Sequence, residues 1–184
     1  MKIGKLIARV IIGGLFFGHG MQKLAGWFGG EGPDATGQTF EKVGLRPGRR
    51  NALAAGAGEA AGGMMLAAGL ATPLAAALLS GSMITAIRKV HLSNGPWAAN
   101  GGYEYNLVLL AALMALVDEG PGGLSADAAL GIEVRGAPWA LAQLAAGAAG
   151  SELTLAISRA EQQRAEQPAP PAAEPGHVEH RHAA

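Results

Sequence analysis

Apolar residues along the chain are grouped in long blocks instead of being spaced at amphipathic intervals. At about 1.5 Å per residue, the first block is long enough to cross a hydrocarbon layer about 30 Å thick. Only Thr72 separates the second block from the third, so we expect an antiparallel hairpin there, with Pro73 in the first turn. The pattern predicts an all-α fold, a four-helix antiparallel transmembrane bundle within residues 1–130. The four predicted helices are residues 3–25, 52–71, 73–92 and 103–117.

The segments outside these blocks are polar or rich in glycine and proline. Residues 38–45 predict a short interfacial helix, and residues 120–127 mark an exit from the membrane with Ser125 as a helix cap. An additional apolar C-terminal helix is predicted within residues 131–158, as a surface helix or a fifth span. Because alanine and glycine insert weakly into bilayers, we favour the surface helix. The composition of residues 159–184 predicts a disordered polar tail containing proline and histidine.

Ionisable side chains lie inside or at the ends of the apolar blocks, where each needs a partner, a wet cavity or a path to the interface. If the helices alternate in direction, these side chains fall in the same half of the bilayer. A Glu59 carboxylate there would be stabilised by Lys23, Arg88 or protonated His19, whereas simple snorkelling to the headgroups is the alternative for Lys23 and Lys89. The predicted polar cluster comprises His19, Lys23, Glu59, Arg88, Lys89, His91, Glu104 and Asn106.

Small residues in the first two blocks predict close helix packing near this cluster. The motifs Gly14-x-x-x-Gly18 and Gly58-x-x-x-Gly62 would let two backbones approach each other. The opposite half of the bundle carries almost no charge apart from Arg9. One stripe of the first helix is predicted to face the bundle, and it contains Arg9, Gly13, Phe16, Gly20 and Lys23.

Composition narrows the functional classes. The formal net charge is zero and no basic stripe with interleaved aromatic residues is present, so we expect no nucleic-acid partner. Without cysteine, the chain makes no disulfide and ligates no iron–sulfur cluster through its own thiolates. We expect neither a metal site nor a covalently bound cofactor. The basic N-terminus imitates a signal peptide, but no small-x-small cleavage site follows, so we expect a retained first transmembrane helix.

These residues, taken in order, resemble the DoxX family of small bacterial membrane proteins. The resemblance covers roughly residues 1–130 and implies a four-helix protein of the cytoplasmic membrane. Some relatives are subunits of thiosulfate:quinone oxidoreductases, and others are linked to redox or oxidative-stress complexes. Residues beyond Gly131 get no support from it. The resemblance is carried by residues 13–24, 58–63, 90–95, 100–106 and 120–127. The family's polar positions correspond to Lys23, Glu59, His91, Glu104 and Asn106.

Three functions follow as alternatives. Our working interpretation is a redox-associated subunit with a quinone in the polar pocket, where His19 and Glu59 would approach the quinone carbonyls and a partner enzyme would supply electrons. The second is a noncatalytic membrane scaffold. The third is a carrier of a small solute or protons, although no two-fold repeat supports it.

The expected location is the cell membrane, with several passes through it. The expected partners are the lipid bilayer and a soluble or membrane-bound redox enzyme. Catalysis by the chain itself and self-association into a homo-oligomer are left open by the sequence.

Overall fold

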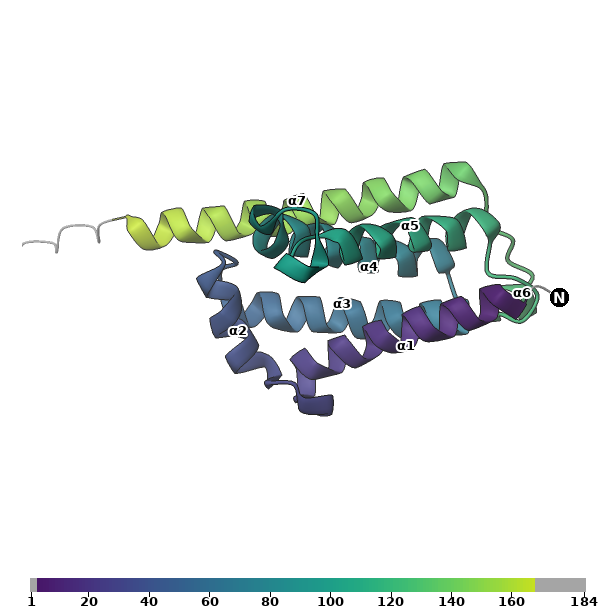
Figure 1. Cartoon of the computed structure of the whole chain (residues 1–184), viewed down its shortest axis with the longest axis horizontal. Helices are drawn as coiled ribbons and strands as arrows, with labels where there is room; N and C mark the ends of the chain where they lie inside the picture. The colour runs from purple at the N-terminus through teal and green to yellow at the C-terminus, as the bar shows by residue number, and fades with distance from the viewer. Residues whose placement is uncertain (1–2, 168–184) are drawn as a thin grey trace, which may run out of the picture.

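The computed structural model describes residues 3–167, and no β-strand occurs among them (Figure 1). The all-helical fold predicted from the sequence is therefore confirmed. The long helices are α1 (Ile3–Ala25), α3 (Gly48–Ala68), α4 (Thr72–Ala86), α5 (Glu104–Glu119) and α7 (Ala137–Glu166). The short elements are η1 (Trp27–Gly29), α2 (Gly32–Lys42), η2 (Ile87–His91), η3 (Leu92–Asn94), η4 (Ala98–Asn100) and α6 (Ala126–Ala129).

The long helices form two layers that run along the same axis (Figure 1). In one layer α1 packs lengthwise against α3, and α2 crosses the end of this pair. In the other layer α4 packs against α5 and α7. The two layers are joined where α3 meets α4, through the tight hairpin that the sequence predicted at Thr72.

The α1–α3 contact uses the predicted stripe but not the predicted glycine motifs. A Cβ atom on Gly13 would lie 2.5 Å from the carbonyl oxygen of Gly63, so the two backbones touch there. By contrast, nothing lies within 4 Å of a Cβ atom placed on Gly14 or Gly58. The prediction was wrong for Gly14 and Gly58 because each residue turns about 100° around a helix, so that a shift of one position leaves the interface. Gly62 does allow a close approach, but to α4, since a Cβ atom there would lie 3.2 Å from the carbonyl oxygen of Ala75. The buried residues of α1 are Arg9, Gly13, Phe16 and Gly20.

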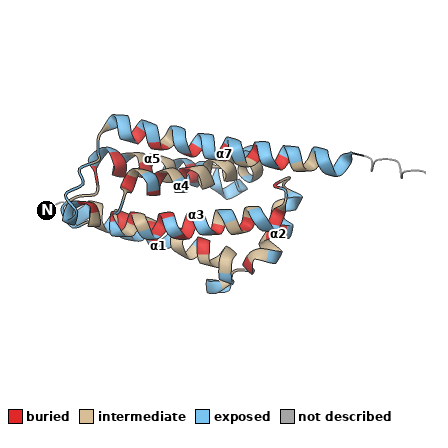
Figure 2. Ribbon diagram, turned by 180° about the vertical axis from the view of Figure 1, so that it is seen from behind, coloured by how far each residue is buried: buried red, intermediate tan, exposed pale blue. Residues whose placement is uncertain are grey.

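A group of large, completely buried apolar side chains lies toward the end of the molecule where α6 is found. Leu66, Leu79, Leu113 and Val117 come from three different helices and are completely buried there. Figure 2 shows buried residues along the facing sides of the helices in both layers. Side chains of this size fill the space between the layers at the α6 end, whereas the polar residues of the predicted cluster lie toward the other end.

The C-terminal helix is longer than the sequence predicted and belongs to the bundle. α7 begins at Ala137, inside the predicted range 131–158, but continues to Glu166, so the prediction of a disordered tail was wrong for residues 159–166. These residues are mostly strong helix formers, and Gln162 donates a hydrogen bond to the Gly44 carbonyl at 3.1 Å. The predicted tail at 168–184 lies outside the described residues.

α7 packs on α4 through small and hydroxylated residues. A Cβ atom on Gly147 would lie 2.9 Å from the backbone nitrogen of Gly81, which marks the point of closest approach. Ser80 donates a hydrogen bond to Gln143 at 3.0 Å, and Thr85 donates one to Ser151 at 2.9 Å. Such contacts are typical of helices that pack within a bilayer.

Two of the described helices, α1 and α7, are long and apolar enough to cross a membrane by length and composition. The other three long helices do not meet both criteria. α3 has 21 residues but is rich in glycine and carries Glu59, which lowers its hydropathy, whereas α4 and α5 contain only 15 and 16 residues.

Candidate functional site

A cavity of about 900 Å³ lies between the two layers. Its wall is mostly apolar, with Leu15, Phe16, Met83 and Leu109 among the lining residues. Helices α1, α3, α4, α5 and α7 and the segment η2 all contribute to it. The polar side chains that line it include His19, Lys23, Glu59, Ser82, Lys89, His91 and Asn106.

Glu59 is the central polar residue of this wall. Its side chain is only 5% exposed, and both of its carboxylate oxygens have partners. Lys23 Nζ lies 2.6 Å from Glu59 Oε2, and the Ser82 hydroxyl donates to Glu59 Oε1 at 2.5 Å. The three residues come from α1, α3 and α4, so this cluster links the two layers. The short distances are those of charge-assisted hydrogen bonds.

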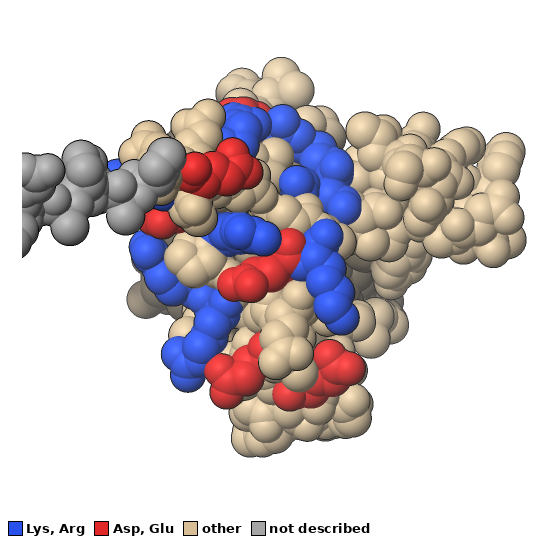
Figure 3. Space-filling model, turned by 90° about the vertical axis from the view of Figure 1, so that its left-hand side faces the viewer, with Lys and Arg blue, Asp and Glu red and all other residues tan. Residues whose placement is uncertain are grey.

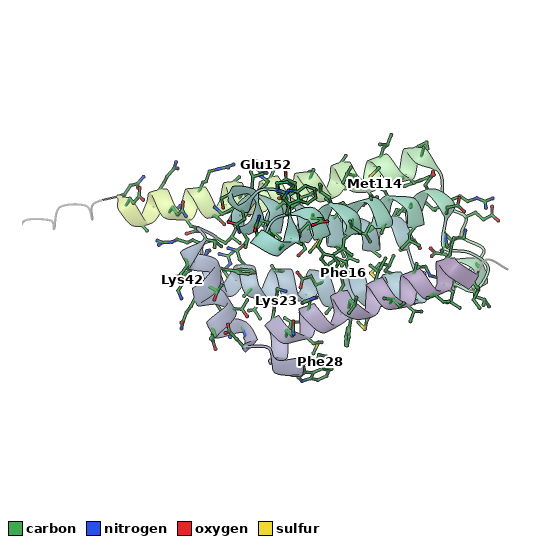
Figure 4. The ribbon with its side chains drawn as sticks, in the orientation of Figure 1. Phe16, Lys23, Phe28, Lys42, Met114 and Glu152 are labelled. Atoms are coloured by element: carbon green, nitrogen blue, oxygen red, sulfur yellow. The ribbon has the colours of Figure 1, made fainter. Side chains whose placement is uncertain are left out.

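Lys23 retains a hydrogen-bonding capacity that this cluster does not use. Its ammonium group donates to Glu59 and, at 3.2 Å, to the carbonyl oxygen of His19. An ammonium group has three N–H donors, so one remains. Because Lys23 lines the cavity and its side chain is 20% exposed, that donor is available to a molecule inside the cavity. Figure 4 shows Lys23 on α1 at the side that faces α3, whereas Phe28 projects away from the bundle.

The structure selects among the partners that the sequence allowed for Glu59. Lys23 is the partner. Arg88 instead forms an ion pair with Glu152 of α7 at 2.5 Å and does not line the cavity. The His19 ring is bonded to Gln22 through Nδ1 at 3.0 Å, although His19 also lines the cavity.

Of the predicted site residues His91, Asn106 and Glu104, two line the cavity and one does not. His91 Nδ1 donates to the carbonyl oxygen of Gly101 at 2.7 Å, and its Nε2 has no partner in the described residues. Asn106 is buried, and its amide contacts Met83 Sδ at 3.4 Å. Both residues line the cavity. Glu104 does not, because its carboxylate accepts a hydrogen bond from the backbone nitrogen of Ala98 at 2.9 Å and so fixes the preceding loop.

Sequence reasoning missed Ser82 and Glu152. Ser82 supplies a hydrogen bond to the buried carboxylate, and Glu152 joins Arg88 to Arg159 of α7. A usable signal existed for Ser82, since Ser80 and Ser82 are polar interruptions of an otherwise apolar block. Glu152 was missed as a partner because the composition of its helix favoured a position on the surface.

A second buried polar cluster lies at the α6 end of the molecule. Arg9 is 1% exposed and donates to the carbonyl oxygens of Pro121 and, at 2.7 Å, Leu124. Asp127 is equally buried and accepts hydrogen bonds from Ala71 N at 2.8 Å and from the hydroxyl of Thr72 at 3.3 Å. The prediction that Arg9 is nearly alone there was therefore wrong, because the loop after α5 folds back and buries Asp127. The predicted Ser125 cap is confirmed by its bond from Ala128 N.

Together these features define a class: a small all-helical protein with an apolar cavity whose wall carries a buried acid–base pair. The chain belongs to the DoxX family, whose family model matches residues 4–92. It is 35% identical over 115 residues to a Bacillus subtilis (strain 168) protein named "Putative oxidoreductase CatD", covering 62% of this chain and 79% of that protein. No solved structure matches the chain.

Proposed function

We propose that this protein is a multi-pass protein of the cell membrane in which α1, α3, α4, α5 and α7 all cross the bilayer. α4 and η2 follow each other directly and contain 15 and 5 residues, which together span about 30 Å at 1.5 Å per residue. The outward-facing residues support this placement, because large apolar side chains cover the outer faces of several helices. Examples are Ile3, Ile7, Val10, Leu107, Val108, Leu141 and Leu153.

Within this membrane protein, we propose that the cavity binds a quinone-like carbonyl compound and that the chain serves as a subunit of a redox system. The observation that carries the proposal is the unused Lys23 donor beside a Glu59 carboxylate whose two oxygens are both hydrogen-bonded, in a mostly apolar wall. Flat apolar molecules with carbonyl groups need such a wall and a few donors that fix their orientation. The similarity to a protein named an oxidoreductase adds support.

Different residues of the cavity wall would contact different parts of such a ligand. Glu59 and Lys23 form an ion pair at 2.6 Å, which holds the ammonium group at the cavity wall. Lys23 can then donate its remaining N–H to a carbonyl oxygen and hold a proton at that atom. His91 presents its Nε2 and Asn106 its amide from a different part of the wall. A bound quinone supplies the capacity to take up two electrons and two protons, and we place the electron donor on a partner enzyme.

Binding of menadione to the purified protein in detergent tests the proposal, with quenching of the fluorescence from the three tryptophans as the measurement. Lys23→Met should weaken binding about tenfold, because a charge-assisted hydrogen bond of about 1.4 kcal/mol is lost. Asp34→Asn is the matched control, since Asp34 is an exposed acid paired with Arg49 outside the cavity. No binding by the unaltered protein, or equal binding by both variants, would overturn the proposal.

A scaffold function is favoured by one specific observation, the row of polar contacts between α4 and α7. Three contacts join α4 and its continuation η2 to α7, and each gives its residues a structural role. They are Ser80–Gln143, Thr85–Ser151 and Arg88–Glu152. In a scaffold, Glu59→Gln lowers the melting temperature but leaves menadione binding unchanged. In the redox subunit, the same substitution lowers the affinity.

A further inference from the structure

The cavity carries one positive charge that no residue of its wall balances. Its ionised side chains are the Glu59 carboxylate and the ammonium groups of Lys23 and Lys89. Lys23 and Glu59 neutralise each other at 2.6 Å. Within the part of the chain that the structure describes, Lys89 has no ion pair and no hydrogen-bond partner. The wall therefore has a net charge of about +1 at neutral pH.

The surroundings of Lys89 explain why this charge stays available. Its neighbour Arg88 is turned toward α7, where it pairs with Glu152. Lys89 itself extends toward the loop after α2, and its Nζ lies 3.1 Å from the position that a Cβ atom on Gly44 would occupy. Glycine at this position leaves the ammonium group room beside the loop. Lys89 is only partly exposed, so its charge is less well hydrated than that of a surface lysine.

Three acidic side chains near this end of the molecule have other partners. Figure 3 looks onto this end, where Lys, Arg, Asp and Glu side chains gather. Asp34 pairs with Arg49, Glu41 accepts a hydrogen bond from Gly48 N, and Glu152 bridges two arginines. A counter-charge for Lys89 is thus expected from outside these groups.

We infer that the cavity selects an anionic ligand: an apolar carbonyl compound whose single acidic group, a carboxylate or an ionised hydroxyl, binds Lys89. This inference rests on the proposed ligand site and specifies its substrate class. A charged group is costly in an apolar cavity unless an opposite charge is present, so the unbalanced ammonium favours a monoanion over a neutral molecule of the same shape.

Two naphthoquinones of nearly equal shape provide the test. 2-Hydroxy-1,4-naphthoquinone is an anion at neutral pH, whereas its methyl ether is uncharged. The unaltered protein should bind the anion about tenfold more tightly, as measured by tryptophan quenching in a neutral detergent. Lys89→Gln should abolish this preference by weakening the binding of the anion about tenfold. Lys89→Arg should retain the preference, which keeps the test valid if Lys89→Gln fails to fold.

Lys42→Gln is the matched control, because Lys42 is an exposed lysine at the end of α2 that does not line the cavity (Figure 4). Equal binding of both compounds by the unaltered protein would overturn the inference while leaving the quinone site in place. A preference that survives Lys89→Gln would also overturn it, since Lys89 would then serve only lipid headgroups. A preference that Lys42→Gln removes equally would assign the effect to the general basic surface. If neither compound binds, the proposed function itself fails.

Discussion

The two ends of the helical bundle each bury charge, but they do so in different ways. At the α6 end, Arg9 is 1% exposed, its guanidinium bonds to loop carbonyls, and it does not line the cavity. At the other end, the Lys23 side chain is 20% exposed and lines a cavity of about 900 Å³. A buried charge is thus not by itself a sign of a ligand site. What distinguishes the Lys23 end is an unused donor that faces empty space.

The largest effect is expected from removing the charge at the α6 end. Arg9→Met leaves two loop carbonyls without donors and the nearby buried Asp127 without a positive neighbour. We expect a loss of about 3 kcal/mol or more in the free energy of unfolding. Thermal unfolding in detergent measures this loss. A free energy of unfolding near that of the unaltered protein would show that Arg9, although buried, contributes little to stability.

A pair of glycines, one at each end, gives the next largest difference. Gly69 has φ +66°, and a Cβ atom there would press against the Arg9 guanidinium, so Gly69→Ala should cost roughly 2 kcal/mol. Gly58 lines the cavity, and nothing lies within 4 Å of the position that a Cβ atom would occupy there, so Gly58→Ala should be neutral or stabilising by up to about 1 kcal/mol. Chemical denaturation compares the two. Equal costs would contradict the distinction between a filled end and an open end.

A smaller change in stability is expected at the cavity itself. Glu59→Gln keeps an acceptor for the Ser82 hydroxyl, and the Lys23 ammonium retains the His19 carbonyl and access to the cavity. We expect a loss of about 1 kcal/mol in the free energy of unfolding, well below that of Arg9→Met. The same unfolding assay serves both variants. A loss as large as that of Arg9→Met would show that the Glu59 cluster stabilises the fold as strongly as the Arg9 cluster does.

The smallest effect is expected for the ion pair outside both clusters. Arg88 and Glu152 are 39% and 51% exposed, so water already solvates them. Arg88→Gln should leave the unfolding free energy nearly unchanged and menadione binding unaltered. A clear loss of binding would mean that α7 controls the shape of the cavity through this pair.

The sequence was most informative where a residue type left few choices. Blocks of apolar residues placed α1 correctly from residue 3 to 25, and alternating helix direction brought Lys23 and Glu59 together as expected. A carboxylate in an apolar helix must find a cation, so this pairing could be predicted. Which cation it finds depends on helix rotation, and rotation is set by packing.

The remaining features depend on tertiary contacts that the sequence pattern does not show. Gly13 and Gly14 look alike in sequence, yet only Gly13 faces α3. Asp127 has the sequence context of an ordinary loop residue, but the loop after α5 covers the start of α4 and buries it. The continuation of α7 to Glu166 depends on two contacts. One joins it to Gly44, which is distant in sequence, and the other joins Glu152 to Arg159, just after the end of the apolar block.

The hydroxyl row on α4 carries an implication for how such proteins can change length during evolution. Ser80 and Thr85 have their hydroxyls satisfied by α7, and Gly81 leaves a notch that Gly147 fills. Without the last helix, the Ser80 hydroxyl would lose its partner and the notch at Gly81 would be open, whereas the Thr85 hydroxyl would keep only its bond to the Gly81 carbonyl. A descendant that lost it would have to acquire compensating apolar replacements on α4 first, so shortening this protein is a coordinated change and not a simple truncation.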